Sequence, residues 1–315
     1  MRALFFGTPE IAVPALEALT QIATVVGVVC QPDKPAGRGL ELKVPAVKAR
    51  ALALGLEVVQ PTKVRTPELA DWVRAREADV AIVMAYGRIL PKAVLDGPRR
   101  GMLNLHASLL PKYRGAAPIA WAIVEGETKT GVALMQMDEG MDTGPVFTMH
   151  EVDIGPNMTA GELSAELARC AATVVHQDVQ RAVLGTLVTS PQDTERATMA
   201  RMLSKEDGLV PWSKGAAQVH NHVRGMTPWP GAFSTLEIGG GRKLFKVLET
   251  RRCEGRSDAT PGSVILAHRG RIEIACGDGV IELVRGQLEG KKALGANDLV
   301  GGRALMQGQV LGCLP

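Results

Sequence analysis

The chain has 315 residues, 46% hydrophobic and 22% charged, with a formal net charge of +3, so we expect a globular protein of one large or two smaller domains. No run of about 18 apolar residues and no signal-peptide pattern is present, so we expect no membrane association and a cytoplasmic location. The five cysteines include no CxxC pair, and the closely spaced His220 and His222 point apart on a helix, so we expect neither disulfides nor a metal site.

The first 188 residues alternate apolar strand candidates with amphipathic helix candidates. The expected strands are residues 2–7, 24–31, 56–61, 78–87 and 102–107. The expected helices are residues 9–19, 44–54, 67–76 and 159–185. Residues 32–39, rich in Pro and Gly, are expected to form a loop, and residues 131–154 two strands around a turn. This alternation predicts an α/β domain with a doubly wound, mostly parallel sheet.

The pattern changes after residues 189–206, a polar and turn-rich stretch that we interpret as a linker. One helix is expected at residues 213–226. Short strands with Gly-rich turns are expected at residues 232–238, 243–250, 262–268, 271–277 and 279–288. Such regular short strands predict a small antiparallel barrel. We therefore predict a catalytic domain at 1–188, a linker at 189–206 and a barrel at 207–315.

The barrel region is basic, with 14 Lys and Arg against 10 Asp and Glu in residues 207–315. A basic second domain favours a polyanionic partner, although ordinary solvated surface charges give the same composition. The first strand-to-helix turn, GTPEIAVP, carries one glycine and an acidic residue, and no GxxxxGK[ST] motif occurs. A dinucleotide or ATP site is therefore not expected, despite the predicted fold.

The segment NLHASLLPKYRGAAP, residues 104–118, follows the strand predicted at 102–107. Period-two alternation places Asn104 and His106 on one face, at the strand end where ligands bind in such sheets. An amide and an imidazole that converge there can hold a carbonyl oxygen as it becomes an oxyanion, and the imidazole can also handle a proton. The alternative is a structural histidine beside an asparagine that caps a turn.

A second polar turn, DEGMDTGP, places Asp138, Glu139 and Asp142 among glycines. A carboxylate brought near His106 would orient its imidazole, whereas an ordinary acidic hairpin turn would have no such role. No cysteine or Gly-x-Ser-x-Gly motif is present to supply a protein nucleophile. The residues therefore favour a site that assists direct attack of one substrate on another.

These two segments, NLHASLLPKYRGAAP and GVALMQMDEGMDTGPV, resemble the 10-formyltetrahydrofolate-dependent formyltransferases. FFGTPEIAVPALEAL, QPDKPAGRG, LSKEDGLVPW, PWPGAFSTLEI and KKALGANDLVGGRAL are similar, in order and spacing, to the branch of this family that acts on methionyl-tRNA. The resemblance covers essentially the whole chain and implies a Rossmann-like formyltransferase domain followed by an OB-like barrel. It implies an enzyme that transfers the formyl group of 10-formyltetrahydrofolate to the α-amino group of initiator methionyl-tRNA, for translation initiation.

The resemblance also implies the site residues. Asn104 and His106 would stabilise the oxyanion of a tetrahedral intermediate, and Asp142 would orient His106 and help to move the proton of the attacking amine. The implied folate contacts are Ile89, Leu90, Ser108, Leu109, Leu110, Pro111, Asp138 and Gly140. The implied tRNA contacts are Arg38, Lys34, Lys43 and Lys48. Family members often carry two lysines after GRG, where this chain has Leu40 and Glu41.

Three points stay open at the level of the sequence. Another folate formyltransferase, or a formyl-folate hydrolase, would share the catalytic half but differ after residue 207. A non-catalytic RNA-binding protein could keep the same scaffold, although we would expect it to have lost Asn104, His106 or Asp142. Lys112 and Arg114 have no assigned role.

We expect a monomer with no obligate protein partner and no metal.

Overall fold

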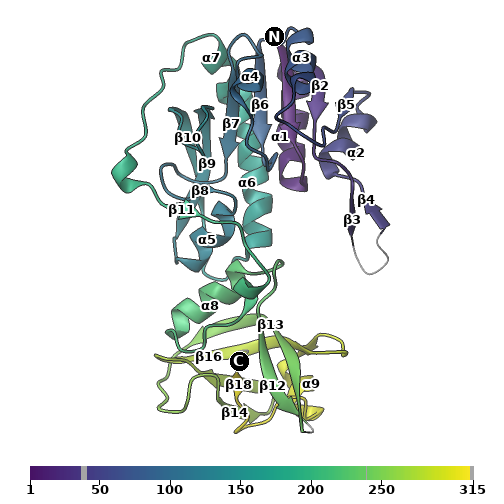
Figure 1. Ribbon diagram of the computed structural model, residues 1–315. Helices are drawn as coiled ribbons and strands as arrows, with labels where there is room; N and C mark the ends of the chain where they lie inside the picture. The colour runs from purple at the N-terminus through teal and green to yellow at the C-terminus, as the bar shows by residue number, and fades with distance from the viewer. Residues whose placement is uncertain (37–40, 239, 313–315) are drawn as a thin grey trace. The chain divides into compact units, whose positions relative to one another are not determined.

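The computed structural model describes residues 1–36, 41–238 and 240–312 (Figure 1). The chain divides into two compact units. The first unit consists of residues 1–118, 129–153 and 164–201, and the second of residues 119–128, 154–163 and 202–315. Residues 189–201, interpreted from the sequence as linker, thus belong to the first unit. The domain limits at 188 and 207 remain predictions.

The first unit is built on a seven-stranded sheet with the strand order β10-β9-β7-β6-β1-β2-β5. Its strands are β1 (Arg2–Gly7), β2 (Thr24–Val29), β5 (Val58–Val59), β6 (Val80–Met84), β7 (Met102–His106), β9 (Lys129–Gln136) and β10 (Val146–Asp153). The five strands from β5 to β7 are parallel, and β9 and β10 add an antiparallel edge. This arrangement confirms the predicted α/β class with a mostly parallel sheet.

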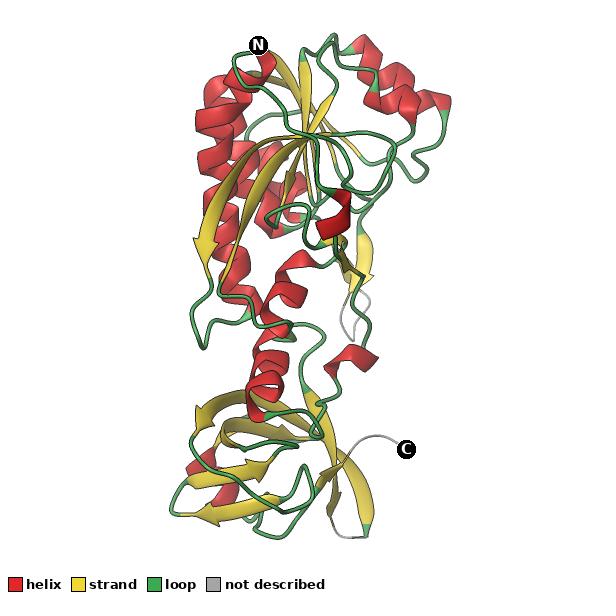
Figure 2. Cartoon of the chain, turned by 90° about the vertical axis from the view of Figure 1, so that its left-hand side faces the viewer, coloured by secondary structure: helices red, strands yellow, loops and turns green. Residues whose placement is uncertain are grey.

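Helices cover both faces of this sheet, as Figure 2 shows. The helices of this unit are η1 (Glu10–Ala12), α1 (Val13–Ile22), α2 (Ala46–Ala53), α3 (Pro67–Ala75), α4 (Lys92–Leu95), most of α6 (Ala160–Val174), α7 (Gln180–Val183) and η3 (Thr194–Arg196), the last of which lies on a loop away from the sheet (Figure 1). β6 and β7 are buried along their whole length, which explains why both appear in the sequence as nearly continuous apolar runs.

The helix predicted at 159–185 is interrupted by a π-helical segment, Val175–Val179. Asp178, in this segment, is buried and accepts hydrogen bonds from Thr148 Oγ1 at 2.9 Å and His150 Nε2 at 2.7 Å. Both partners lie on β10. A π-turn inserts one extra residue into the helix and so changes which side chains face the sheet, a change that hydrophobic periodicity does not reveal.

Residues 34–36, within the loop predicted at 32–39, instead form one strand of a short antiparallel ribbon, which corrects that part of the prediction. Strand β3 (Lys34–Ala36) pairs with β4 (Glu41–Lys43), with Pro35 opposite Leu42. A proline has no N–H to donate and is therefore excluded from central strands. A two-stranded ribbon consists only of edges, so it tolerates the proline that made this stretch resemble a loop.

The second unit is a curled antiparallel sheet, consistent with the predicted small barrel. Its path is β14-β15-β16-β13-β12-β18, and β17 pairs with β16. An antiparallel bridge between Ser263 and Val310, next to β14 and β18, joins the two ends of this path. The strands are β12 (Phe233–Ile238), β13 (Gly241–Cys253), β14 (Val264–His268), β15 (Arg271–Ala275), β16 (Val280–Leu288), β17 (Leu294–Gly295) and β18 (Leu311–Gly312).

The helices of the second unit include the predicted α8 (Ala216–Gly225). The others are α5 (Pro118–Val124), η4 (Glu206–Gly208) and α9 (Ala296–Gly301), which were not predicted. The core between α8 and the curled sheet contains Val219, Val223, Phe245 and Ile281. Across the described ranges, no helix is both long enough and apolar enough to cross a membrane.

Candidate active site

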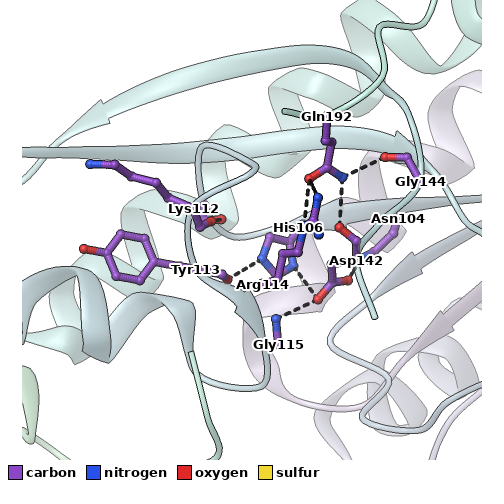
Figure 3. Close-up of polar contacts among 10 residues, drawn as sticks. Asn104, His106, Lys112, Tyr113, Arg114, Gly115, Asp142, Gly144 and Gln192 are labelled. Atoms are coloured by element: carbon purple, nitrogen blue, oxygen red, sulfur yellow. Dashed lines mark hydrogen bonds and ion pairs between the residues drawn. The ribbon is translucent and has the colours of Figure 1, made fainter. Parts of the chain in front are cut away.

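The site forms where β7 ends. Asn104 lies between Val83 of β6 and Met135 of β9, and His106 is the last residue of β7. Their side chains emerge on the same face, and both reach the carboxylate of Asp142 (Figure 3). Asn104 is only 9% exposed and His106 only 6%. The same-face placement follows from the alternation of side chains along a strand.

The turn between β9 and β10 delivers Asp142 to this face. Asp142 has a φ of +54°, a left-handed conformation that aspartate tolerates better than most residues. Its Oδ1 accepts a hydrogen bond from Asn104 Nδ2 at 3.2 Å, and its Oδ2 accepts one from the Gly115 N–H at 2.8 Å. The same Oδ2 lies 3.6 Å from His106 Nδ1. One carboxylate thus contacts both side chains of β7.

The imidazole of His106 is oriented by a main-chain group. Its Nε2 lies 2.9 Å from the carbonyl oxygen of Tyr113. A carbonyl oxygen only accepts, so Nε2 must carry the hydrogen. Nδ1 is then the nitrogen that faces Asp142, and its distance of 3.6 Å from Oδ2 is longer than a hydrogen bond. The hydrogen bond that holds the ring is therefore the one to Tyr113.

The segment that supplies these main-chain groups is β8 (Arg114–Gly115) with Tyr113 before it. It pairs in parallel with β11 (Met199–Ala200), which lies in the stretch interpreted as linker. Gly115 has a φ of +113°, and a Cβ on it would lie 2.8 Å from the carbonyl oxygen of Ala200. Only glycine fits this conformation and this close approach without strain. Gly115 is thus required for the loop to place its N–H against Asp142.

A glutamine from the same stretch reaches the Asp142 turn. Gln192 Nε2 donates to the carbonyl oxygens of Asp142 at 2.8 Å and Gly144 at 2.7 Å. Its Oε1 accepts from Arg114 Nε at 3.0 Å and Nη2 at 2.8 Å (Figure 3). The sequence drew attention to Arg114 without giving it a role, and nothing in the sequence around Gln192 indicated this contact.

The residues implied to bind folate have different surroundings. Leu90 and Leu110 are buried in apolar clusters and Ser108 is buried, whereas Ile89 is 53% exposed. The Ser108 hydroxyl donates to the carbonyl oxygen of Lys112 at 2.6 Å, which shapes the turn. Asp138 closes its own turn, accepting from the Gly140 N–H and Thr143 Oγ1. Ser108 and Asp138 thus have structural partners, and contact of these eight residues with folate remains a prediction.

Of the residues implied to bind tRNA, Lys34 and Lys43 lie on the β3–β4 ribbon and Lys48 lies on α2. Arg38 lies outside the described residues. Lys48 forms an ion pair with Asp33 at 2.8 Å, and Lys34 donates to Gln31 Oε1 at 3.1 Å. Lys43 is exposed. Since Asp33 balances the charge of Lys48, the exposed Lys43 offers the more accessible cation, and contact of these residues with RNA remains a prediction.

A surface hollow of about 440 Å³ lies elsewhere, at the end of β5. It is lined by Val59, Gln60, Pro61, Thr62, Lys63, Thr66, Glu68, Leu69 and Trp72. None of the residues that surround Asp142 is among them. Within the part of the chain that the structure describes, no group of three or more His, Cys, Asp and Glu side chains could hold a metal ion.

The chain matches two protein families. Residues 1–179 match the family described as formyl transferase, and residues 202–304 match the formyl transferase C-terminal domain. The chain is 61% identical over 312 residues to the methionyl-tRNA formyltransferase of Sorangium cellulosum, covering 99% of this chain and 100% of that protein. It is 45% identical over 307 residues to the methionyl-tRNA formyltransferase of Myxococcus xanthus, covering 98% and 96%.

Solved structures show the same fold at low sequence identity. An N-formyltransferase of Helicobacter canadensis, in complex with folinic acid and dTDP-3-aminofucose, is 18% identical with a TM-score of 0.67, covering 89% of this chain and 98% of that one. HypX of Aquifex aeolicus in complex with tetrahydrofolic acid is 18% identical with a TM-score of 0.60, covering 96% of this chain and 47% of that one. At this identity the likeness concerns the fold alone.

Proposed function

This chain belongs to the formyl transferase family and transfers a formyl group to methionyl-tRNA, and we propose that Asn104, His106 and Asp142 carry out the transfer. The family uses formyl-folate donors, and we propose 10-formyltetrahydrofolate as the donor and initiator methionyl-tRNA as the acceptor. The observation that carries the proposal is the convergence of all three side chains at the end of β7.

The proposed reaction is direct attack without a covalent enzyme intermediate. The neutral α-amino nitrogen forms a bond to the formyl carbon, and the π electrons of the carbonyl move onto its oxygen. The amine then gives up one proton. When the carbonyl re-forms, the bond from carbon to N10 of the folate breaks with its electron pair, and N10 takes up a proton. The products are formyl-methionyl-tRNA and tetrahydrofolate.

Asn104 is proposed to stabilise the negative oxygen. A carboxylate only accepts, so the amide nitrogen of Asn104 must be the atom that faces Asp142. That bond uses one of the two N–H groups of the amide. Within the described residues, the second N–H group donates to no acceptor. A fixed N–H directed at a developing oxyanion typically contributes about 3–4 kcal/mol to lowering the barrier. The bond to Asp142 thus fixes the amide orientation in advance.

His106 is proposed as the second donor. Its Nε2–H is engaged with Tyr113, so it can donate to the substrate only through Nδ1, which requires the protonated ring. Asp142 Oδ2 lies 3.6 Å from Nδ1, so the carboxylate borders the same edge of the ring. Nε2 is therefore fixed by a main-chain oxygen, and Nδ1 is proposed to face the reacting carbonyl.

Asp142 is proposed to take the proton of the attacking amine and to pass it to N10. A carboxylate offers about four lone-pair positions, and the bonds from Asn104 and Gly115 use two of them. Its position beside both β7 side chains brings the proton acceptor near the nitrogen that loses the proton. The acceptor, a tRNA, supports a cytoplasmic location.

The test uses purified full-length protein with 10-formyltetrahydrofolate and charged initiator tRNA. His106→Ala should lower kcat by about two to four orders of magnitude, the usual range for a positioned acid–base group. Lys129→Ala is the control, because Lys129 pairs with Glu151 at the exposed far end of β9. Activity of the His106 variant near that of the control would remove His106 from the mechanism. Formylation of small amines but not of charged tRNA would overturn the acceptor.

A further inference from the structure

We infer that Gln192 and Arg114 are positioning residues for formyl transfer, which hold the main chain of the turn that carries Asp142. This inference rests on the proposed role of Asp142. Neither side chain contacts a reacting group of the site. They affect catalysis by fixing the position of the Asp142 carboxylate.

The geometry assigns Gln192 four hydrogen bonds. Its Nε2 donates to the carbonyl oxygens of Asp142 and Gly144, and its Oε1 accepts two bonds from Arg114. Both N–H groups and both lone-pair positions of the amide are then used. An amide satisfied in this way has a single orientation, so the turn is fixed at two main-chain positions, one of them Asp142 itself.

The guanidinium of Arg114 strengthens these bonds. Its side chain is 6% exposed, so its charge is largely removed from water. A hydrogen bond from an ionised donor is stronger than one between neutral groups, and it polarises the amide that receives it. The Nε2–H groups of Gln192 become better donors as a result. The positive charge of Arg114 thus reaches the Asp142 turn through the amide.

The turn needs this support because of its conformation. Asp142 has a φ of +54°, and a non-glycine residue in that region is held there by its surroundings. The bonds from Asn104 and Gly115 hold the carboxylate, whereas Gln192 holds the peptide group to which it is attached. Without Gln192 the peptide can relax, and the carboxylate moves away from its place beside His106 Nδ1.

The same stretch of chain supports the other half of the site. Thr198 Oγ1 accepts from the Tyr113 N–H at 2.9 Å, and its carbonyl oxygen accepts from the Arg114 N–H at 2.8 Å. Tyr113 is the residue whose carbonyl holds His106. Gln192 and Thr198, from one polar and turn-rich stretch, therefore support the main chain on both sides of the site.

The experiment compares two substitutions of Gln192 with the same two substitutions of Gln180. Gln180 is an exposed residue of α7 whose Nε2 donates to the carbonyl oxygen of Ile22 at 3.1 Å. Gln192→Ala removes all four bonds, whereas Gln192→Glu keeps the size and the acceptor for Arg114 but places a carboxylate against two carbonyl oxygens. We expect both Gln192 variants to lower kcat roughly 10- to 100-fold, since small displacements of catalytic groups have effects of this size. The KM values for both substrates should change by less than roughly threefold, because Gln192 holds a catalytic group rather than a substrate.

A double-mutant cycle with Asp142→Asn separates positioning from a general structural role. If Gln192 acts through Asp142, then Gln192→Ala should lower the residual kcat of the Asp142 variant by less than about twofold. An equal loss in both backgrounds would overturn the inference, and so would Gln192 variants that behave like their Gln180 counterparts. Either result leaves the proposed function standing if His106→Ala is inactive. A fully active Asp142→Asn variant would overturn the proposed role of Asp142, and the inference with it.

Discussion

The substitution Asp142→Asn tests the charge at the centre of the site with almost no change in shape. Both carboxylate oxygens act as acceptors, Oδ1 from Asn104 and Oδ2 from Gly115, and Oδ2 also faces His106 Nδ1. An asparagine has only one acceptor oxygen, so one of these two bonds is lost in either orientation of the amide. The negative charge beside the imidazole is lost as well.

The size of the effect follows from the lost hydrogen bond. The carboxylate of Asp142 accepts two hydrogen bonds, and the asparagine variant loses one of them. A hydrogen bond to a charged group contributes about 1.5–3 kcal/mol. Since each ~1.4 kcal/mol is a tenfold change in rate, we expect kcat to fall roughly 10- to 150-fold.

The assay is single-turnover formylation of charged initiator tRNA at saturating folate, which isolates the transfer step from product release. Asp71→Asn is the matched control, because Asp71 is an exposed acidic residue of α3 paired with Arg74. The control should retain the wild-type rate. A transfer rate for Asp142→Asn within about fivefold of that control would refute this reasoning.

Two further predictions concern packing and pH. Gly115→Ala should lower the free energy of unfolding by about 2 kcal/mol, because the new Cβ would meet the carbonyl oxygen of Ala200. The same substitution should slow formyl transfer by roughly tenfold or more. Gly55→Ala, with a φ of +72° and open space around it, is the control in thermal unfolding and rate assays, and equal behaviour of the two would contradict the prediction. Burial lowers the pKa of His222 to about 4, below the 6.5 of the unfolded chain, so only the unfolded state takes up a proton as pH falls between these values. We therefore expect the free energy of unfolding of the wild type to fall by about 2–3 kcal/mol more than that of His222→Leu between about pH 7 and 4.5. Urea unfolding followed by circular dichroism measures both values. Equal losses in the two proteins would exclude this histidine as the cause.

The sequence predicted most of the regular elements because their patterns are local. The buried strands β6 and β7 appear as apolar runs, and α1 and α3 show helical spacing after a proline near their first turn. The π segment and the β3–β4 ribbon were missed for a common reason. The π segment depends on the hydrogen bonds between Asp178 and β10, and the ribbon depends on the pairing of β3 with β4. Both involve contacts with another segment of the chain, and hydrophobic periodicity does not report such contacts.

The sequence alone determined part of the site. The alternation along β7 placed Asn104 and His106 on one face, because successive side chains of a strand point to opposite sides. The turn between two strands made the approach of a carboxylate to His106 a hypothesis, and the family resemblance identified that carboxylate as Asp142. The structure adds that this approach requires a left-handed residue, which no spacing in the sequence indicates.

Only the tertiary structure decided what holds those side chains in place. The carbonyl of Tyr113 and the N–H of Gly115 are groups that almost every residue has, so their use cannot be inferred from residue type. Gln192 is separated from Asp142 by 50 positions, and Thr198 from Tyr113 by 85. Contacts over such separations form only when the strands and residues 192–200 of the first unit are folded together. The sequence therefore specifies the chemical groups, and the fold specifies their orientation.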